Sequence, residues 1–223
     1  LSLDTSGEPL FKRGYRVETG PAPINEVMAA GLLKMAGWEG KGNFLDPMCG
    51  SATLPIEAAM IAMNIPAQLH RKDFSFMHWK DFNAKLWEKI KETRLNRIQD
   101  FSGEIWGYDI NMLMVKVAEQ NVKSANLQDF IKLKQVNFFQ TKKDLFPLLV
   151  IFNPPYGERM EISTEDFYQK MGETFKENYP NTYVWLITSD TEEIKNIGLK
   201  PTQKMKMYNG KIETEFVKYE IYE

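Results

Sequence analysis

Hydrophobic and polar residues follow two alternating patterns along most of the chain. From residue 43 onward, short apolar runs bounded by turn residues are followed by longer stretches whose apolar positions have helical spacing. Strands and helices in turn predict parallel strands joined by crossover helices, and therefore a sheet covered by helices on both faces. We expect strands at residues 43–46, 105–109, 131–135, 148–153 and 183–188, and helices at residues 25–35, 53–63, 112–124 and 163–177.

The C-terminal part of the chain has a different pattern. Two extended runs, residues 200–208 and 211–222, flank the pair Asn209-Gly210. Asn-Gly between such runs is the strongest short-range signal for a hairpin, so we expect the last two strands to be antiparallel. The fold class is therefore α/β: a doubly wound, Rossmann-like sheet of seven strands, mostly parallel, with an antiparallel C-terminal hairpin and helices on both faces.

Two segments lie outside this alternation. We expect residues 1–20 to be a linker or hairpin outside the core, continuing from an earlier part of the protein, and residues 21–223 to form the main domain. Residues 64–101 separate the first crossover helix from the second strand and predict a helical insertion. The insertion carries eight Lys and Arg against five Asp and Glu, so it is basic although the whole chain has a net charge of −2.

Composition narrows the class of protein. No apolar run approaches the roughly 20 residues that cross a bilayer, so we expect no membrane segment. The chain has one Cys, Cys49, and two His, too few for an internal disulfide or a standard zinc site. We therefore expect a cytoplasmic protein without a metal. With a net charge of −2 and a pI of about 5.9, the chain is no polycation, and if it binds nucleic acid it must do so through a local basic face or with help from another module.

The turn after the first expected strand is a candidate ligand site. Residues 46–53 read Asp-Pro-Met-Cys-Gly-Ser-Ala-Thr, a small-residue turn between a strand and a helix. Open α/β sheets bind ligands at this edge. Gly50 stands alone where a dinucleotide fingerprint needs three glycines, and Asp46 places a negative charge that favours a cationic amine over a phosphate. The alternative is an ordinary strand-to-helix turn with a capping Asp.

The next two strand ends extend this site. Asp109 ends the second strand, and its two acceptor oxygens suit the two hydroxyls of a ribose, although such residues also cap helices. After the third strand, Asn137 can bond to a purine edge while Phe138 lies against the ring. Together the three strand ends predict a site for an adenosine.

The fourth strand ends in the sequence Asn153-Pro154-Pro155-Tyr156. Consecutive prolines fix the backbone and present carbonyl acceptors without N–H donors. The Asn153 amide oxygen and the Pro154 carbonyl can accept from one NH₂ group, while Tyr156 offers a ring for stacking. The segment predicts a receptor for an exocyclic amine on an aromatic base, the alternative being a proline-stiffened loop.

These motifs resemble those of class I S-adenosylmethionine-dependent methyltransferases that modify exocyclic amines. More narrowly, the chain resembles the bacterial ribosomal RNA guanine-N2 methyltransferases that carry an N-terminal THUMP RNA-binding domain. The resemblance covers nearly the whole chain. The motifs that carry it are Lys12-Arg13-Gly14-Tyr15-Arg16, Ala22-Pro23-Ile24-Asn25-Glu26, the turn at residues 46–53, Asp109 and Asn153-Pro154-Pro155-Tyr156-Gly157-Glu158-Arg159.

The resemblance implies a cofactor, a reaction and a partner. S-adenosylmethionine would lie across the strand ends with its amino group near Asp46, its ribose on Asp109 and its adenine near Ile110, and would leave as S-adenosylhomocysteine. The implied cofactor-binding residues are Pro23, Asn25, Asp46, Pro47, Cys49, Gly50, Ser51, Thr53, Asp109, Ile110, Asn137 and Phe138. The implied catalytic residues are Asn153, Pro154, Pro155 and Tyr156, the substrate is RNA, ribosomal RNA in particular, and no metal is involved.

The chain departs from the family pattern at three points. Ala52 stands where the family commonly has Gly, which is tolerated if that residue need not adopt positive φ. Asn137 stands where the family usually has Asp. We expect the chain to correspond to the linker and catalytic parts of the family, without the THUMP domain. The Asn-Pro-Pro-Tyr motif does not distinguish guanine N2 from adenine N6, so a DNA adenine-N6 methyltransferase and a non-catalytic nucleic-acid-binding scaffold remain as alternatives.

Overall fold

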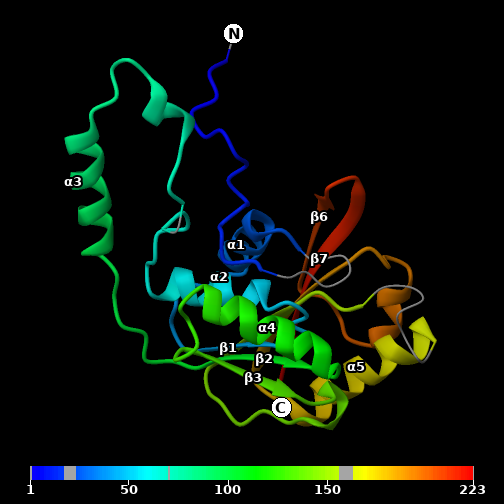
Figure 1. Cartoon of the computed structure of the whole chain (residues 1–223). Helices are drawn as coiled ribbons and strands as arrows, with labels where there is room; N and C mark the ends of the chain where they lie inside the picture. The colour runs from blue at the N-terminus through cyan, green and yellow to red at the C-terminus, as the bar shows by residue number, and fades with distance from the viewer. Residues whose placement is uncertain (1, 18–23, 70, 156–162, 223) are drawn as a thin grey trace.

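The strands form one sheet at the positions where the apolar runs predict them. A computed structural model describes residues 2–17, 24–69, 71–155 and 163–222. The strands are β1 Asn43–Asp46, β2 Ile105–Asp109, β3 Ile131–Gln135, β4 Leu148–Phe152, β5 Thr182–Thr188, β6 Gln203–Asn209 and β7 Ile212–Ile221. Their order in the sheet is β3-β2-β1-β4-β5-β7-β6, and β1, β2 and β3 lie side by side in Figure 1. The expected seven-stranded fold is confirmed.

The pairing of the strands explains where ligands can reach the sheet. The first five strands pair in parallel, and β7 pairs antiparallel to both β5 and β6. Chain order runs from β1 outward to β3 on one side, and β4 then returns to lie beside β1 on the other. The helices that follow β1 and β4 consequently leave toward opposite faces, and open α/β sheets generally bind ligands beyond such a pair of strand ends.

Helices cover both faces of the sheet. Hydrophobic residues of α1 Glu26–Met35, α2 Thr53–Ala62 and α4 Met112–Ser124 pack on one face, and those of α5 Thr164–Asn178 and the short η4 Glu193–Ile197 pack on the other. Side chains alternate between faces along each strand, so Phe44 contributes to the first cluster and Leu45 to the second. The central parallel strands β1 and β4 are therefore buried on both sides, whereas the edge strand β3 has exposed residues.

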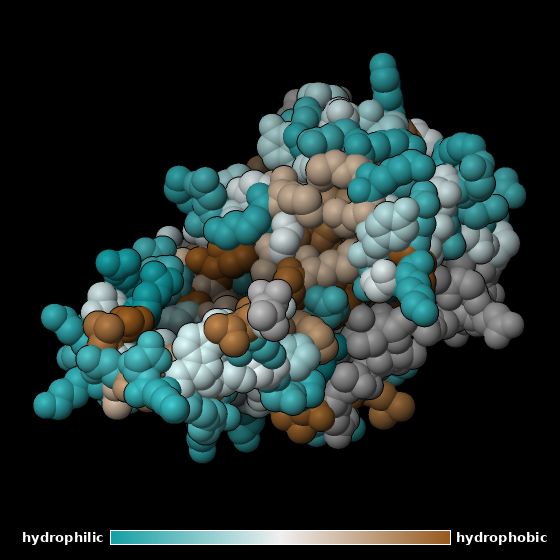
Figure 2. Space-filling view, turned by 90° about the horizontal axis from the view of Figure 1, so that it is seen from above, coloured by the Kyte–Doolittle hydropathy of each residue, from teal (hydrophilic) through white to brown (hydrophobic). Residues whose placement is uncertain are grey.

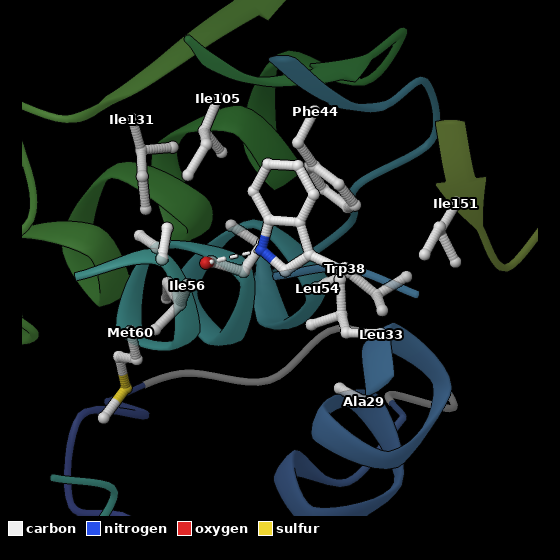
Figure 3. Close-up of a cluster of buried hydrophobic side chains, with 14 of the residues drawn as sticks. Ala29, Leu33, Trp38, Phe44, Leu54, Ile56, Met60, Ile105, Ile131 and Ile151 are labelled. Atoms are coloured by element: carbon white, nitrogen blue, oxygen red, sulfur yellow. Dashed lines mark hydrogen bonds between the residues drawn. The ribbon is translucent and has the colours of Figure 1, made fainter. Parts of the chain in front are cut away.

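The helix α2 is the most deeply buried helix among the described residues. All of its residues except Ile61 are buried, because the sheet covers one side and α1 another. Figure 3 shows the cluster around it, where the Trp38 indole N–H donates to the Ala58 carbonyl oxygen at 2.9 Å. This bond satisfies both polar groups inside an apolar cluster.

The N-terminal residues correct one expectation. Residues 2–17 contain no strand, and residues 13–17, which we call the strap, are not an exposed hairpin. Arg13 and Tyr15 are buried against α2. Arg13 Nε and Nη2 lie 3.2 and 3.4 Å from the two carboxylate oxygens of Glu57, and the Tyr15 hydroxyl donates to Glu57 at 3.1 Å. The strap is part of the core because α2 supplies a buried partner for its charge.

The insertion forms an arm that extends from the body of the molecule. Its main element is α3 Ala84–Leu95, preceded by the short η1 Ser75–His78 (Figure 1). No residue of α3 is buried, whereas Trp87 packs with Phe74 and Phe76 at ring distances of 5.7 and 5.1 Å. The expected helical insertion is present, and an aromatic cluster holds it rather than the main core.

The face of the molecule that lies at the top in Figure 1 carries both hydrophobic and hydrophilic residues (Figure 2). Hydrophobic residues gather in a hollow near the middle of this face, and hydrophilic residues surround them (Figure 2).

Within the described part of the chain, no helix combines the length and the apolar character that crossing a membrane requires.

Candidate active site

Three predicted polar residues end adjacent strands on one face of the sheet. Phe44, Ile105 and Ile151 point into the cluster beneath α2. Asp46, Asp109 and Asn153 follow them by an even number of residues, so strand alternation directs all three side chains to that same face. Since β1 lies between β2 and β4, Asp46 is central to the group.

The turn between β1 and α2, residues 47–52, is attached to the end of β2. The Cys49 N–H donates to the Tyr108 carbonyl at 2.7 Å. The Gly50 N–H donates to Asp109 Oδ2 at 3.0 Å, and Gly50 has a φ of +52°, which glycine adopts without strain. The Asn111 N–H donates to Asp109 Oδ1 at 2.8 Å. Each Asp109 oxygen keeps a further lone pair for a ligand hydroxyl.

Ala52 occupies the position where the family commonly has glycine. Its φ is +64° and its ψ is 28°, so it does adopt the left-handed conformation. An alanine at this position is therefore strained, whereas a glycine would not be. A residue with a Cβ pays roughly 1–2 kcal/mol for this conformation. The turn is nevertheless retained, with the Ala52 N–H donating to the Cys49 carbonyl at 2.8 Å.

A buried carboxyl group, Asp46, and a partly buried one, Asp109, give the site a preference for positive charge. Burial raises the pKa of Asp46 well above its usual value near 3.8, against the opposing hydrogen bond from the Met48 N–H, and the charge of Asp109 adds to the rise. Burial also raises the pKa of Asp109, while the N–H groups of Asn111 and Gly50 oppose the rise. A cation placed between them would lower both pKa values.

Cys49 lies in the turn as a packing residue. Its side chain is buried beside Gly107, where an added Cβ would come within 3.0 Å of the Cys49 sulfur. Burial, with the charges of Asp46 and Asp109, raises the pKa of the Cys49 thiol. The thiol is therefore protonated at neutral pH and is a poor nucleophile.

Ser51 of the turn and the adjoining Thr53 belong to a polar network with Arg16 and Asn121. Arg16 Nη2 donates to Thr53 Oγ1 at 2.9 Å, and the Thr53 and Ser51 oxygens are 3.4 Å apart. Asn121 Nδ2 of α4 donates to the Ser51 carbonyl at 3.0 Å. The sequence alone does not predict that Arg16 and Asn121 lie next to the turn. The resemblance pointed to the segment that contains Arg16, whereas Asn121 carries no sequence signal.

Three further predicted site residues, Ile110, Asn137 and Asn25, lie at the end of a strand or at the start of a helix. Ile110 follows β2 directly and is 62% exposed, which leaves it open to a ligand. Asn137 Oδ1 accepts from the Phe139 N–H at 3.0 Å and so caps the short helix η2 Phe138–Gln140. Asn25 likewise caps α1, accepting from the Met28 N–H at 2.8 Å.

Phe138 is placed differently from the expectation that its ring lies against a base. Its side chain is 3% exposed and belongs to the cluster on the α5 face, 5.0 Å from the Phe175 ring and 5.6 Å from the Tyr179 ring. Its side chain is therefore a core group, on the face opposite to Asp46.

The fourth strand brings its motif beside the turn. Asn153 follows β4 directly and is half-buried, Pro154 is buried and Pro155 is half-buried. Because β4 pairs with β1 through Leu45 and Val150, the motif and the turn leave neighbouring strands. Tyr156 and Pro23, also predicted to belong to the site, lie outside the described residues.

Two further observations concern the described chain away from these strand ends. A small surface depression near Trp106, Tyr108 and Lys143 is lined by none of the predicted site residues. Over the described ranges, no group of three or more His, Cys, Asp and Glu side chains is arranged to hold a metal ion.

Comparisons with known proteins place the geometry in context. Residues 13–218 match the family model UPF0020, described as "RMKL-like, methyltransferase domain". "Ribosomal RNA large subunit methyltransferase K/L" of Shewanella amazonensis is 36% identical over 100% of this chain and 32% of its own length. "Putative RNA methyltransferase YpsC" of Bacillus subtilis is 38% identical over 98% of this chain and 57% of its own length. The chain thus spans about a third to just over half of these relatives.

Solved structures share the fold at similar identity. SMU.472, described as "a putative methyltransferase complexed with SAH", has a TM-score of 0.91 and 35% identity over 99% of this chain and 58% of its own. A "predicted N6-adenine-specific DNA methylase" from Listeria monocytogenes has a TM-score of 0.87 and 34% identity over 98% of this chain and 57% of its own. The expected class I methyltransferase fold is confirmed.

Proposed function

Since the chain belongs to the RMKL-like methyltransferase domain family, we propose that it methylates the exocyclic N2 amine of a guanine in RNA, ribosomal RNA in particular. The methyl donor would be S-adenosylmethionine. The observation that carries the proposal is the convergence of Asp46, Asp109 and the Asn153-Pro154 pair at three adjacent strand ends. The names of the relatives support RNA as the substrate class.

The chemistry of the strand ends fits this cofactor. Asp46 is a buried carboxyl with a raised pKa, so the positive amino group of a methionine moiety would stabilise its charged form. The N-terminus of α2 has no side-chain cap, and its positive dipole end suits the carboxylate of the same moiety. Asp109 has lone pairs for the ribose, and Ile110 and Asn137 would lie beside the adenine. S-adenosylmethionine supplies a methyl group made electrophilic by a positively charged sulfur.

The chain itself supplies alignment. The Asn153 side-chain oxygen and the Pro154 carbonyl would accept the two hydrogens of the target amine and turn its lone pair toward the β1 end. Proline rigidity keeps the acceptors in place, which favours the reactive geometry entropically. Extruding the base from its stack costs a few kcal/mol, and stacking on Tyr156 would offset about 1–3 kcal/mol of it. The reaction needs no covalent enzyme intermediate.

Capture of the RNA would be shared with the rest of the protein. The net charge of −2 does not favour tight binding by this chain alone. We propose that a THUMP-like RNA-binding domain in the remainder of the whole protein supplies that affinity, and that the protein acts in the cytoplasm. Residues 64–101 would then form a basic insertion within a catalytic domain that includes the strap as well as the expected residues 21–223.

A DNA adenine-N6 methyltransferase is the second candidate. The amine acceptors fit the N6 group of adenine as well as the N2 group of guanine. The similarity to the Listeria monocytogenes structure, described as an adenine-specific DNA methylase, also favours keeping it. The two candidates differ in the nucleoside that they produce, and an experiment separates them.

The test uses the full-length protein and labelled S-adenosylmethionine. Ribosomal RNA from a strain lacking the gene and unmethylated DNA are each incubated with both, digested, and analysed for labelled nucleosides. We expect N2-methylguanosine in RNA, whereas label in N6-methyladenine of DNA would overturn the choice of substrate. No transfer to either substrate, together with no binding of S-adenosylhomocysteine, would favour the non-catalytic scaffold.

The variant Asn153→Ala tests the mechanism. We expect methyl transfer to fall by at least about 10²-fold, because the target amine loses one of its two acceptors and its alignment. Binding of S-adenosylhomocysteine, measured by calorimetry, should stay within about threefold of wild type, since Asn153 contacts the base and not the donor. Unchanged turnover of the substrate would refute the proposed amine clamp.

A further inference from the structure

The strap runs along α2 and reaches the turn at its end. Glu57 and Thr53 are one helical turn apart on α2, so they lie on the same side of the helix. Arg13 and Tyr15 contact Glu57, and Arg16 contacts Thr53. Successive strap residues therefore contact successive turns of α2, and the last contact is at its first residue.

Arg16 joins three parts of the chain through one guanidinium group. Its Nη2 donates to the Ile24 carbonyl at 2.8 Å and to Thr53 Oγ1 at 2.9 Å. Its Nε lies 3.0 Å from Glu26 Oε1, and both side chains are mostly buried. Arg16 thus joins the strap, the start of α1 and the start of α2. A planar guanidinium with several donors can make such a junction, whereas an ammonium group cannot match its geometry.

A second link connects the strap to the same turn from α4. The Val17 N–H donates to Asn121 Oδ1 at 2.8 Å, and Asn121 Nδ2 donates to the Ser51 carbonyl at 3.0 Å. The buried Asn121 therefore bridges the strap backbone to the backbone of the turn. Asn121 therefore holds the turn at residues 47–52 at Ser51, and Arg16 holds the adjoining Thr53. On the side of β2, the Gly50 N–H holds the turn to Asp109.

We infer that Arg16 is a positioning residue, which sets the conformation of the turn at residues 47–52 and thereby the affinity for the methyl donor. The inference rests on the proposed function, because it takes this turn to be the donor site. The conformation of Ala52 makes these contacts to the turn more important. The turn contains a residue in the unfavourable left-handed conformation, so it needs contacts from its surroundings to persist. The Thr53 contact of Arg16 adjoins that residue.

The test compares two conservative strap variants, Arg16→Lys and Tyr15→Phe. Tyr15→Phe removes the hydrogen bond to Glu57 and keeps the ring, so it weakens the strap without touching the turn. Calorimetry with S-adenosylhomocysteine measures donor-site affinity, and thermal melting measures stability. We expect Arg16→Lys to weaken binding on the order of 10-fold. This magnitude is taken by analogy from metal sites, where loss of a residue that supports a ligand costs at least about 10-fold in affinity. Tyr15→Phe should stay within about twofold, although both variants melt earlier.

The variant Thr53→Val supplies an independent check because it removes the acceptor and keeps the shape of the side chain. We expect it to weaken S-adenosylhomocysteine binding as well, and the double variant with Arg16→Lys to lose less than the product of the two single losses. Equal affinity of Arg16→Lys and wild type, or equal losses for Arg16→Lys and Tyr15→Phe, would overturn the inference. Failure of the wild-type protein itself to bind S-adenosylhomocysteine would instead refute the donor site of the proposed function.

Discussion

The ion pair between Arg13 and Glu57 provides a quantitative test of how the strap is held. The Arg13 side chain is 10% exposed and that of Glu57 is 2% exposed, and two nitrogens of Arg13 face the two carboxylate oxygens. Burial raises the pKa of Glu57, and Arg13 and Tyr15 oppose that rise. Removing Arg13 leaves a buried carboxyl whose main stabilising charge is gone.

We expect Arg13→Met to lower the free energy of unfolding by about 3–5 kcal/mol at pH 8, the usual cost of breaking a buried pair from one side. At about 2–4 °C per kcal/mol for a chain of this size, a loss of 3 kcal/mol lowers the melting temperature by roughly 6–12 °C. Glu57→Met should cost a similar amount. The double variant should unfold within about 1–2 kcal/mol of wild type, because no charge is left buried and only the Tyr15 hydroxyl loses its acceptor.

The pH dependence gives a second readout. Without Arg13, the pKa of Glu57 should rise further above its usual value of 4.5. The folded variant then binds a proton that the unfolded chain has released, so its stability falls as the pH rises from about 4.5 through the folded-state pKa. The deficit relative to wild type should therefore be smaller at pH 5 than at pH 8. Urea unfolding, followed by tryptophan fluorescence, measures it.

Two results would refute this reasoning. One is additive loss in the double variant, which would mean that the two side chains do not stabilise each other. The other is an equal deficit at pH 5 and pH 8, which would mean that the carboxyl of Glu57 does not become protonated when Arg13 is removed.

Two other predictions concern the site. The pKa values of Asp46 and Asp109 are raised above their usual value near 3.8 in the free protein. The amino group proposed to lie at Asp46 and the ribose hydroxyls proposed to lie at Asp109 would both stabilise the charged carboxylates. The melting-temperature increase produced by S-adenosylhomocysteine should therefore grow as the pH rises from about 4 through those raised values. Thermal melts with and without the ligand at several pH values check this, and a ligand effect independent of pH in that range would contradict it. Ala52→Gly should unfold within about 1 kcal/mol of wild type, because relief of left-handed strain offsets a lost buried methyl and greater unfolded-chain entropy. Ala52→Val should cost more than about 2 kcal/mol, because a β-branched side chain is strained at φ +64° and the site is fully buried; equal stability of the two variants would contradict this account.

The sheet was predictable because its signals are local. Turn residues bound each apolar run, and the Asn209-Gly210 pair alone indicated the C-terminal hairpin that β6 and β7 form. The charged strand ends were predictable for the same reason. Asp46 and Asp109 terminate runs of apolar residues, and parallel strands bring such ends to one edge.

The strap was not predictable because its partners are distant in sequence. A run that contains Arg13, Tyr15 and Arg16 has the composition of an exposed segment, and Glu57 lies 44 residues from Arg13. Only the folded α2 shows that these charges are paired inside the protein. Phe138 was misplaced for a geometric reason. Its ring faces the α5 side of the sheet, whereas Asp46 and Asp109 are directed toward the α2 side.

The arm has a consequence for how the protein tolerates change. None of the residues of α3 is buried, and its aromatic cluster is separate from the two main clusters. Insertions, deletions or proteolytic cuts within the arm therefore cost little of the packing that holds the sheet together. Evolution can accordingly lengthen, shorten or recharge the arm to suit different macromolecular surroundings while the catalytic body retains its architecture.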